Sequence, residues 1–212
     1  MLLKFINYIN KEKLMLEYII PFFTYLFSPI LIELFTKNVT YSDLGKVILT
    51  GMLLAFYWKK YKIKWKISFL AFFVGALIFG FWVFLEGYYP IIGTPKGFEP
   101  LNSFELIIRL FSSILIAPLI EELFIRSFFN RYLISQNWKK LPIESTTTYS
   151  FWITVLFFGF SHNRWLPGLI AGILLNLVLI KKKDISQAIF AHFIANLFLS
   201  IYVIATKSWI FW

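Results

Sequence analysis

Seven long apolar segments constrain the fold of this chain more than any other feature of its sequence. A helix needs about 20 mostly apolar residues to cross a bilayer. Lipid offers no hydrogen-bond partner to backbone groups, so a spanning segment must be a helix or part of a closed barrel. The segments are too long and alternate too little for barrel strands. We therefore predict an all-α integral membrane protein with about seven transmembrane helices, over residues 15–36, 45–58, 67–86, 104–130, 149–163, 165–180 and 185–206.

The composition agrees with a membrane protein. Hydrophobic residues make up 59% of the 212 residues, against roughly 45–50% in soluble domains. The chain has no cysteine, which excludes disulfides and thiolate zinc sites. Its net charge of +10 does not predict a nucleic-acid partner, because excess Lys and Arg mark cytoplasmic loops in membrane proteins. The N-terminal sequence MLLKFINYINKEK lacks the cleavage site of a signal peptide. We expect one polytopic domain over residues 1–212.

The basic residues between the spans predict an orientation. With the N-terminus inside, fourteen Lys and Arg residues lie on the inner side of the membrane and five on the outer side. The inner residues are Lys4, Lys11, Lys13, Lys59, Lys60, Lys62, Lys64, Lys66, Arg131, Lys139, Lys140, Lys181, Lys182 and Lys183. The outer residues are Lys37, Lys46, Lys96, Arg164 and Lys207. Because basic residues are enriched on the cytoplasmic side, we predict a multi-pass protein of the cell (cytoplasmic) membrane with its N-terminus inside and its C-terminus outside.

A few polar side chains interrupt the spans. An ionisable group at membrane depth costs about 2.5–3.5 kcal/mol even on the gentler scales, and usually marks function. The residues are Glu121, Glu122, Arg126, His162, His192 and Asn196. Glu122 and Arg126 are four residues apart and meet on one helix face, whereas Glu121 is turned about 100° away. We predict that Arg126 neutralises Glu122 and that Glu121 points into a polar cavity.

Two further spacings concern the same spans. His192 and Asn196 are four residues apart and so share one face of the last span. Pro118 lies one turn before the glutamates and removes a backbone hydrogen bond, which predicts a kink in the fourth span.

Three sequence motifs resemble those of a known family. EELFIR (Glu121–Arg126) matches an EExxxR pattern, FGFSH (Phe158–His162) an FxxxH pattern, and HFIAN (His192–Asn196) an HxxxN pattern. In this order and on separate helices, they resemble the CPBP intramembrane proteases. This family is also called the CAAX-protease and bacteriocin-processing, or Abi, family, and is related to the type II CAAX prenyl endopeptidases. The resemblance covers about residues 104–200, a catalytic core; the first three spans carry no motif.

The resemblance implies membrane helices packed around a polar cavity, and a glutamate-dependent peptidase. By this resemblance the residues divide into three pairs: Glu121 and His162 activate water, His192 and Asn196 stabilise the oxyanion, and Glu122 and Arg126 support the site. The expected function is hydrolysis of a peptide bond in a membrane-associated protein or peptide. Eukaryotic members of the family trim prenylated CaaX proteins, but no feature of this chain indicates a prenyl substrate.

The residues also leave two other functions open. Chains of Glu and His relay protons in transporters, so a proton-coupled membrane transporter is one alternative. The sequence shows neither the inverted repeat nor the paired broken helices of many transporters. A non-catalytic peptide-binding immunity protein is the other alternative.

The residue types also leave a metal site open. Glu121, His162 and His192 form a His₂Glu set of the kind that zinc accepts. The HExxH signature of zinc peptidases is absent. Asn196 is a poor zinc ligand but a good amide donor, and it lies one turn from His192. We therefore predict a mechanism with no cofactor, with zinc as the alternative.

Overall fold

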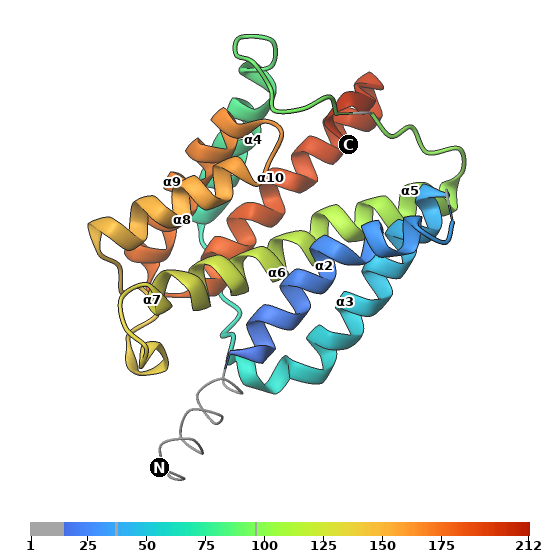
Figure 1. The fold of residues 1–212 in the computed structure, drawn as a ribbon. Helices are drawn as coiled ribbons and strands as arrows, with labels where there is room; N and C mark the ends of the chain where they lie inside the picture. The colour runs from blue at the N-terminus through green and yellow to red at the C-terminus, as the bar shows by residue number, and fades with distance from the viewer. Residues whose placement is uncertain (1–14, 37, 96) are drawn as a thin grey trace. The chain divides into compact units, whose positions relative to one another are not determined.

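The computed structural model describes residues 15–36, 38–95 and 97–212, which form helices joined by loops (Figure 1). Within these ranges the chain contains no β-strand. Its contacts divide it into two units, Met1–Lys62 and Ile63–Trp212. Lys4, Lys11, Lys13, Lys37 and Lys96, which contribute to the predicted orientation, lie outside the described residues.

The first unit is a helical hairpin of α2 (Leu16–Glu33) and α3 (Val39–Tyr61), which pack side by side (Figure 1). The side chain of Asn38 accepts a hydrogen bond from a backbone N–H in the first turn of α3 and so caps that helix. At the other end of the hairpin, the buried hydroxyl of Tyr61 donates to the carbonyl oxygen of Glu17 at 2.7 Å. The two ends of the hairpin are thereby tied together.

The second unit contains four helices and one long, composite helix. The four are α4 (Phe69–Phe84), α8 (Thr148–Phe160), α9 (Trp165–Lys182) and α10 (Ile185–Thr206). The composite helix runs without a break through α5 (Ser103–Leu110), η1 (Phe111–Ile116), α6 (Ala117–Glu122), η2 (Leu123–Phe129) and α7 (Asn130–Tyr132). Single 3₁₀ turns occur at η3 (Trp138–Lys140) and η4 (Trp209–Phe211). Helix α10 packs against α4, α9 and the composite helix, and α8 packs against α9.

Small residues allow α8 and α9 to approach closely. A Cβ atom built on Gly168 would lie 3.0 Å from the carbonyl oxygen of Gly159, and one on Gly172 would lie 3.2 Å from Cα of Val155. Both distances are tighter than ordinary packing, so larger side chains would push the helices apart. Such small-residue contacts are typical of membrane helix pairs. The contact holds polar side chains of α8 within reach of polar side chains of α9.

The helices confirm the predicted fold class. Each predicted span corresponds to one helix. Within the part of the chain that the structure describes, five helices are long and apolar enough to cross a membrane: α2, α3, the composite helix, α9 and α10. The third and fifth predicted spans correspond to α4 and α8, shorter apolar helices of 16 and 13 residues. Helix α3 is longer than the predicted 45–58 because its cap lies at Asn38. The chain is a multi-pass membrane protein.

Candidate active site

The composite helix changes its hydrogen-bond register at Pro118. The backbone N–H of Ala117 donates to the carbonyl oxygen of Ser112, five residues earlier, which is the π-helical register. The carbonyl oxygen of Ser113 thereby loses its α-helical donor, and its π-helical donor would be Pro118, which has no N–H. That oxygen instead accepts a hydrogen bond from Nδ2 of Asn196 at 2.8 Å. The kink predicted at Pro118 thus takes the form of a π-helical segment, which gives Asn196 its partner.

Glu122, Arg126 and His192 form one buried cluster. Oε1 of Glu122 accepts from Nη1 of Arg126 at 3.1 Å and from Nδ1 of His192 at 2.9 Å. Glu122 and Arg126 are fully buried, and His192 is 6% exposed. The predicted pairing of Glu122 with Arg126 is present. The contact with His192 joins the first and third motifs, 70 residues apart in the chain.

Glu121 occupies a different position from its neighbour. Its Oε2 atom is buried and has no hydrogen-bond partner among the described residues. The side chain as a whole is half-buried, whereas Glu122 is fully enclosed. One carboxylate is therefore held by a guanidinium and an imidazole, and the other has an oxygen left to meet a further group.

Phe158 lies at the centre of the motif residues. The Arg126 guanidinium carbon lies 4.3 Å from the centroid of its ring, a cation–π contact. The centroids of the His162 and His192 rings lie 4.8 Å and 5.6 Å from the same centroid. Phe158 is 1% exposed. A single aromatic ring therefore contacts side chains from all three motifs.

His162 lies in the turn between α8 and α9, two residues beyond the end of α8 at Phe160. The sequence predicted it inside a span over 149–163; the helix ends earlier, where the Ser161 hydroxyl donates to the carbonyl oxygen of Phe158 at 2.8 Å. Nδ1 of His162 lies 2.7 Å from that carbonyl oxygen. A carbonyl oxygen only accepts, so Nδ1 carries the proton and Nε2 of the neutral ring is an acceptor.

Asn196 and His192 share one face of α10, as predicted, and both contact the composite helix. The amide of Asn196 carries two N–H donors, of which one is bound to the carbonyl oxygen of Ser113. His192 uses Nδ1 toward Glu122. Each side chain is thus anchored through one nitrogen-bound hydrogen, while a second N–H of Asn196 and Nε2 of His192 are left for other partners.

The turn that carries His162 is tied to the loop after α4. Arg164 forms a two-pronged ion pair with Glu86, with Nε and Nη2 at 2.7 Å and 2.8 Å from the two carboxylate oxygens. The side-chain amide of Asn163 donates to the carbonyl oxygen of Ile92 at 2.7 Å, and the backbone carbonyl oxygen of Asn163 accepts from the Ile92 N–H at 2.9 Å. Trp165 donates to a carbonyl oxygen of the same loop. The position of His162 is therefore fixed from outside its own helix.

Tyr89 belongs to the same loop and packs edge-on against Trp165, with ring centroids 5.8 Å apart. Burial and the nearby carboxylate of Glu86 together raise the pKa of its hydroxyl to about 12. The hydroxyl therefore stays protonated at neutral pH and adds no negative charge beside the carboxylate of Glu86.

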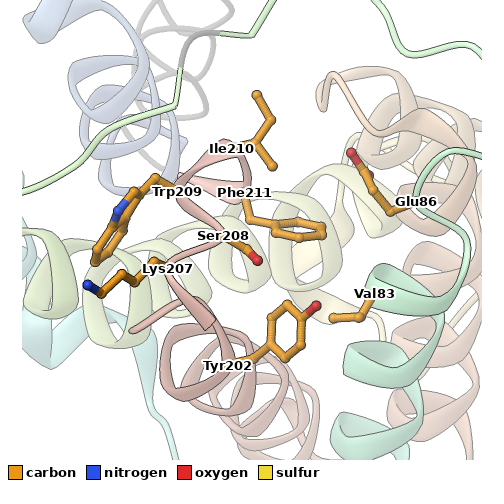
Figure 2. A pocket seen from close by; sticks show the side chains of 8 residues that line it. All are labelled: Val83, Glu86, Tyr202, Lys207, Ser208, Trp209, Ile210 and Phe211. Carbon is orange, nitrogen blue, oxygen red and sulfur yellow. The ribbon is translucent and has the colours of Figure 1, made fainter. Parts of the chain in front are cut away.

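A cavity of about 500 Å³ lies beside Glu86, the residue that pairs with Arg164 (Figure 2). Its lining residues are Val83, Glu86, Tyr202, Lys207, Ser208, Trp209, Ile210 and Phe211. In Figure 2 the rings of Tyr202 and Phe211 lie between the end of α10 and Glu86; their centroids are 5.9 Å apart. None of the six predicted site residues lines this cavity.

Several polar residues of this region were missed from the sequence. Asn176 and Thr154 lie in apolar spans and are hydrogen-bonded to each other, and Asn176 is also hydrogen-bonded to Arg126 of the first motif. A lone amide within GILLNLVLI was the available signal for Asn176. Arg164 was read only as a topology marker, and its partner Glu86 was read only as the end of a span. No sequence spacing links residues 78 positions apart.

The alternative zinc site does not assemble among the described residues. No group of three or more His, Asp or Glu side chains lies close enough to hold a metal ion in residues 15–36, 38–95 and 97–212. Glu121, His162 and His192 thus form no metal-binding group within these ranges.

The fold and this cluster define a polytopic membrane protein with a buried ion pair and a buried histidine, His192, among its helices, and a second histidine, His162, in an adjoining turn. Residues 103–198 match the family model described as type II CAAX prenyl endopeptidase Rce1-like. The matched range contains all six predicted site residues and confirms the family resemblance suggested by the three motifs. No curated protein and no solved structure matches the chain. The family match supports an intramembrane protease of the CAAX type.

Proposed function

We propose that this chain is a glutamate-dependent intramembrane endopeptidase that hydrolyses a peptide bond of a membrane-associated protein or peptide. The observation that carries this proposal is the buried contact between Glu122 and His192. It brings the first and third motifs together and leaves Glu121 with a carboxylate oxygen that has no partner among the described residues. We further propose the cytoplasmic membrane as its location, with the N-terminus inside.

In this proposal, Glu121 and His162 activate the attacking water. Oε2 of Glu121 is a buried acceptor suited to take a proton. Nε2 of His162 is an acceptor as well, because Nδ1 donates to the carbonyl oxygen of Phe158. Water held by both acceptors transfers a proton to Glu121 as its oxygen attacks the peptide carbonyl carbon. A positioned carboxylate base contributes typically 10²–10⁴-fold to such a step.

His192 and Asn196 stabilise the oxyanion that forms. Asn196 contributes the amide N–H that Ser113 does not occupy. His192 contributes Nε2–H in its imidazolium form, in which both ring nitrogens donate and Nδ1 is held by Glu122. The tetrahedral intermediate collapses when the carbon–nitrogen bond breaks, and the proton on Glu121 moves to the leaving amine. Glu122 and Arg126 act by holding His192 and take no proton.

Reconstituted protein tests this proposal. The purified chain is placed in liposomes with membrane-anchored proteins encoded beside it in its genome, and new peptide termini are identified by mass spectrometry. We expect new termini with the unaltered chain and none with Glu121→Ala. Termini that form equally with both proteins would come from a contaminating protease and would leave the chain without this activity.

A further inference from the structure

Two side chains outside the three motifs, Asn176 on α9 and Thr154 on α8, are buried beside the active-site cluster. Asn176 is 4% exposed and Thr154 is fully buried. Oδ1 of Asn176 accepts from Nε of Arg126 at 3.3 Å, and Nδ2 of Asn176 donates to Oγ1 of Thr154 at 3.0 Å. A continuous set of hydrogen bonds thus runs from Thr154 through Asn176 and Arg126 to the Glu122–His192 pair.

Thr154 and Arg126 together determine the direction of the hydrogen bonds that Asn176 makes. Its hydroxyl has one hydrogen, which points to backbone carbonyl oxygens of its own helix, those of Ser150 and Phe151, each 2.9 Å away. The hydroxyl oxygen can therefore only accept from Asn176. An amide that donates to Thr154 must turn its oxygen toward Arg126. Asn176 thus presents its oxygen, and not its NH₂ group, to the guanidinium.

Arg126 is held on three sides by this arrangement. Nε meets the oxygen of Asn176, Nη1 meets Glu122, and the flat face of the guanidinium lies over Phe158. These contacts fix the plane of the group as well as its position. Because Nη1 and His192 share the same oxygen of Glu122, a rotation of the guanidinium would also move the acceptor that holds Nδ1 of His192.

We propose that Asn176 and Thr154 are positioning residues of this active site: they orient Arg126 so that Glu122 holds the His192 ring in one orientation, with Nδ1 on Glu122 and Nε2 left for a substrate. This inference rests on the proposed function for its catalytic meaning. Its structural content, the coupling of Thr154 to the His192 ring, does not depend on any substrate.

The test compares Thr154→Val with Thr154→Ser. Valine has nearly the shape of threonine but no hydroxyl, and serine keeps the hydroxyl. The full-length chain, labelled with ¹⁵N-histidine, is studied by NMR in lipid nanodiscs. It has only two histidines, so a His162→Gln spectrum assigns the signals of His192.

We expect Thr154→Val to shift or split the His192 ring-nitrogen signals, because the ring is then no longer held in one orientation on Glu122. Thr154→Ser should keep the unaltered spectrum, and the His162 signals should stay in place in both variants. Unchanged His192 signals in folded Thr154→Val would overturn the proposal. An equal shift in Thr154→Ser would also overturn it, because side-chain size and not the hydroxyl would then be responsible.

A measurement on the unaltered chain keeps the proposal testable if Thr154→Val does not fold. With ¹⁵N-arginine and ¹⁵N-asparagine labels, the Nε–H of Arg126 should give a cross-peak to Asn176 and should exchange slowly with solvent. Rapid exchange of that hydrogen, or no cross-peak, would overturn the proposal. Neither NMR experiment needs a substrate, so a chain that cleaves nothing could still show the coupling, and a protease could lack it.

Discussion

Nδ1 of His192 lies 2.9 Å from Oε1 of Glu122, the oxygen that also accepts from Arg126. One buried carboxylate oxygen therefore serves a cation on its own helix and an imidazole on another. The spacing of the sequence predicts only the first of these contacts. The second gives Glu122 a defined part in the site, because it binds Nδ1 of His192 and leaves Nε2 to face a substrate.

The first prediction concerns stability. Glu122→Gln removes the carboxylate that forms a direct ion pair with Arg126. Breaking one side of a buried ion pair typically costs about 3–5 kcal/mol. We expect Glu122→Gln to lower the unfolding free energy by this amount in detergent. Glu121→Gln is the matched control and should unfold near the unaltered chain, since no described residue pairs with its buried oxygen. The reverse order of stabilities would exchange the roles of the two glutamates.

The second prediction concerns Asn196. Asn196→Ala removes an oxyanion donor, so it should reduce kcat by about 10²–10³ on any peptide that the unaltered chain cleaves. KM should change little, because the donor acts on charge that develops in the transition state. The same change strips the Ser113 carbonyl oxygen of its hydrogen bond, and a modest loss of stability should accompany it. A raised KM with normal kcat would assign Asn196 to substrate binding.

Local patterns in the sequence predicted the spans and the pairing of Glu122 with Arg126. Hydropathy identifies the segments that lie in lipid, and a segment in lipid must form a helix to satisfy its backbone hydrogen bonds. The four-residue spacing reports contacts within one helix. These two signals determined the fold class and one of the contacts of Glu122 correctly.

Contacts between helices were beyond those patterns. The pairing of His192 with Glu122 depends on how α10 packs on the composite helix, and no local spacing encodes it. Asn176 and Thr154 were missed because a single polar residue in a span usually joins helices without further function. The π-helical segment before Glu121 was only partly predicted, since Pro118 indicates a lost hydrogen bond but does not specify the new register.

The third prediction concerns topology. The excess of basic residues on one side predicts that Lys183 faces the cytoplasm and Trp212 the exterior. Reporter fusions after these two positions should therefore give opposite signals, cytoplasmic for the first. Helix α10, which lies between them, has 22 residues and enough apolar character to cross the membrane. The same signal from both fusions would mean that α10 does not cross.

The fourth prediction concerns metal. Glu121, His162 and His192 form no metal-binding group among the described residues, and the proposed chemistry uses carboxylate, imidazole and amide groups alone. Purified active protein should therefore contain less than stoichiometric zinc by elemental analysis, and a chelator should leave its turnover unchanged. Activity that is lost on chelation and regained with zinc would make His162 and His192 ligands.

The fifth prediction concerns the proposed base, Glu121. Glutamine keeps the shape of this side chain but cannot take a proton from water. Turnover by Glu121→Gln should fall by about 10²–10⁴-fold, the usual contribution of a general base. The variant should remain folded, as judged by thermal unfolding beside Glu122→Gln.

The proposal that Glu121 is the general base is tested most directly by cleavage in H₂¹⁸O, measured for the reconstituted chain and for Glu121→Gln. Mass spectrometry of the products reports both the rate and the source of the new carboxylate oxygen. The account predicts that the unaltered chain places one ¹⁸O atom in the new C-terminus and that folded Glu121→Gln yields almost no labelled product. Labelled product formed by Glu121→Gln at nearly the unaltered rate would contradict it.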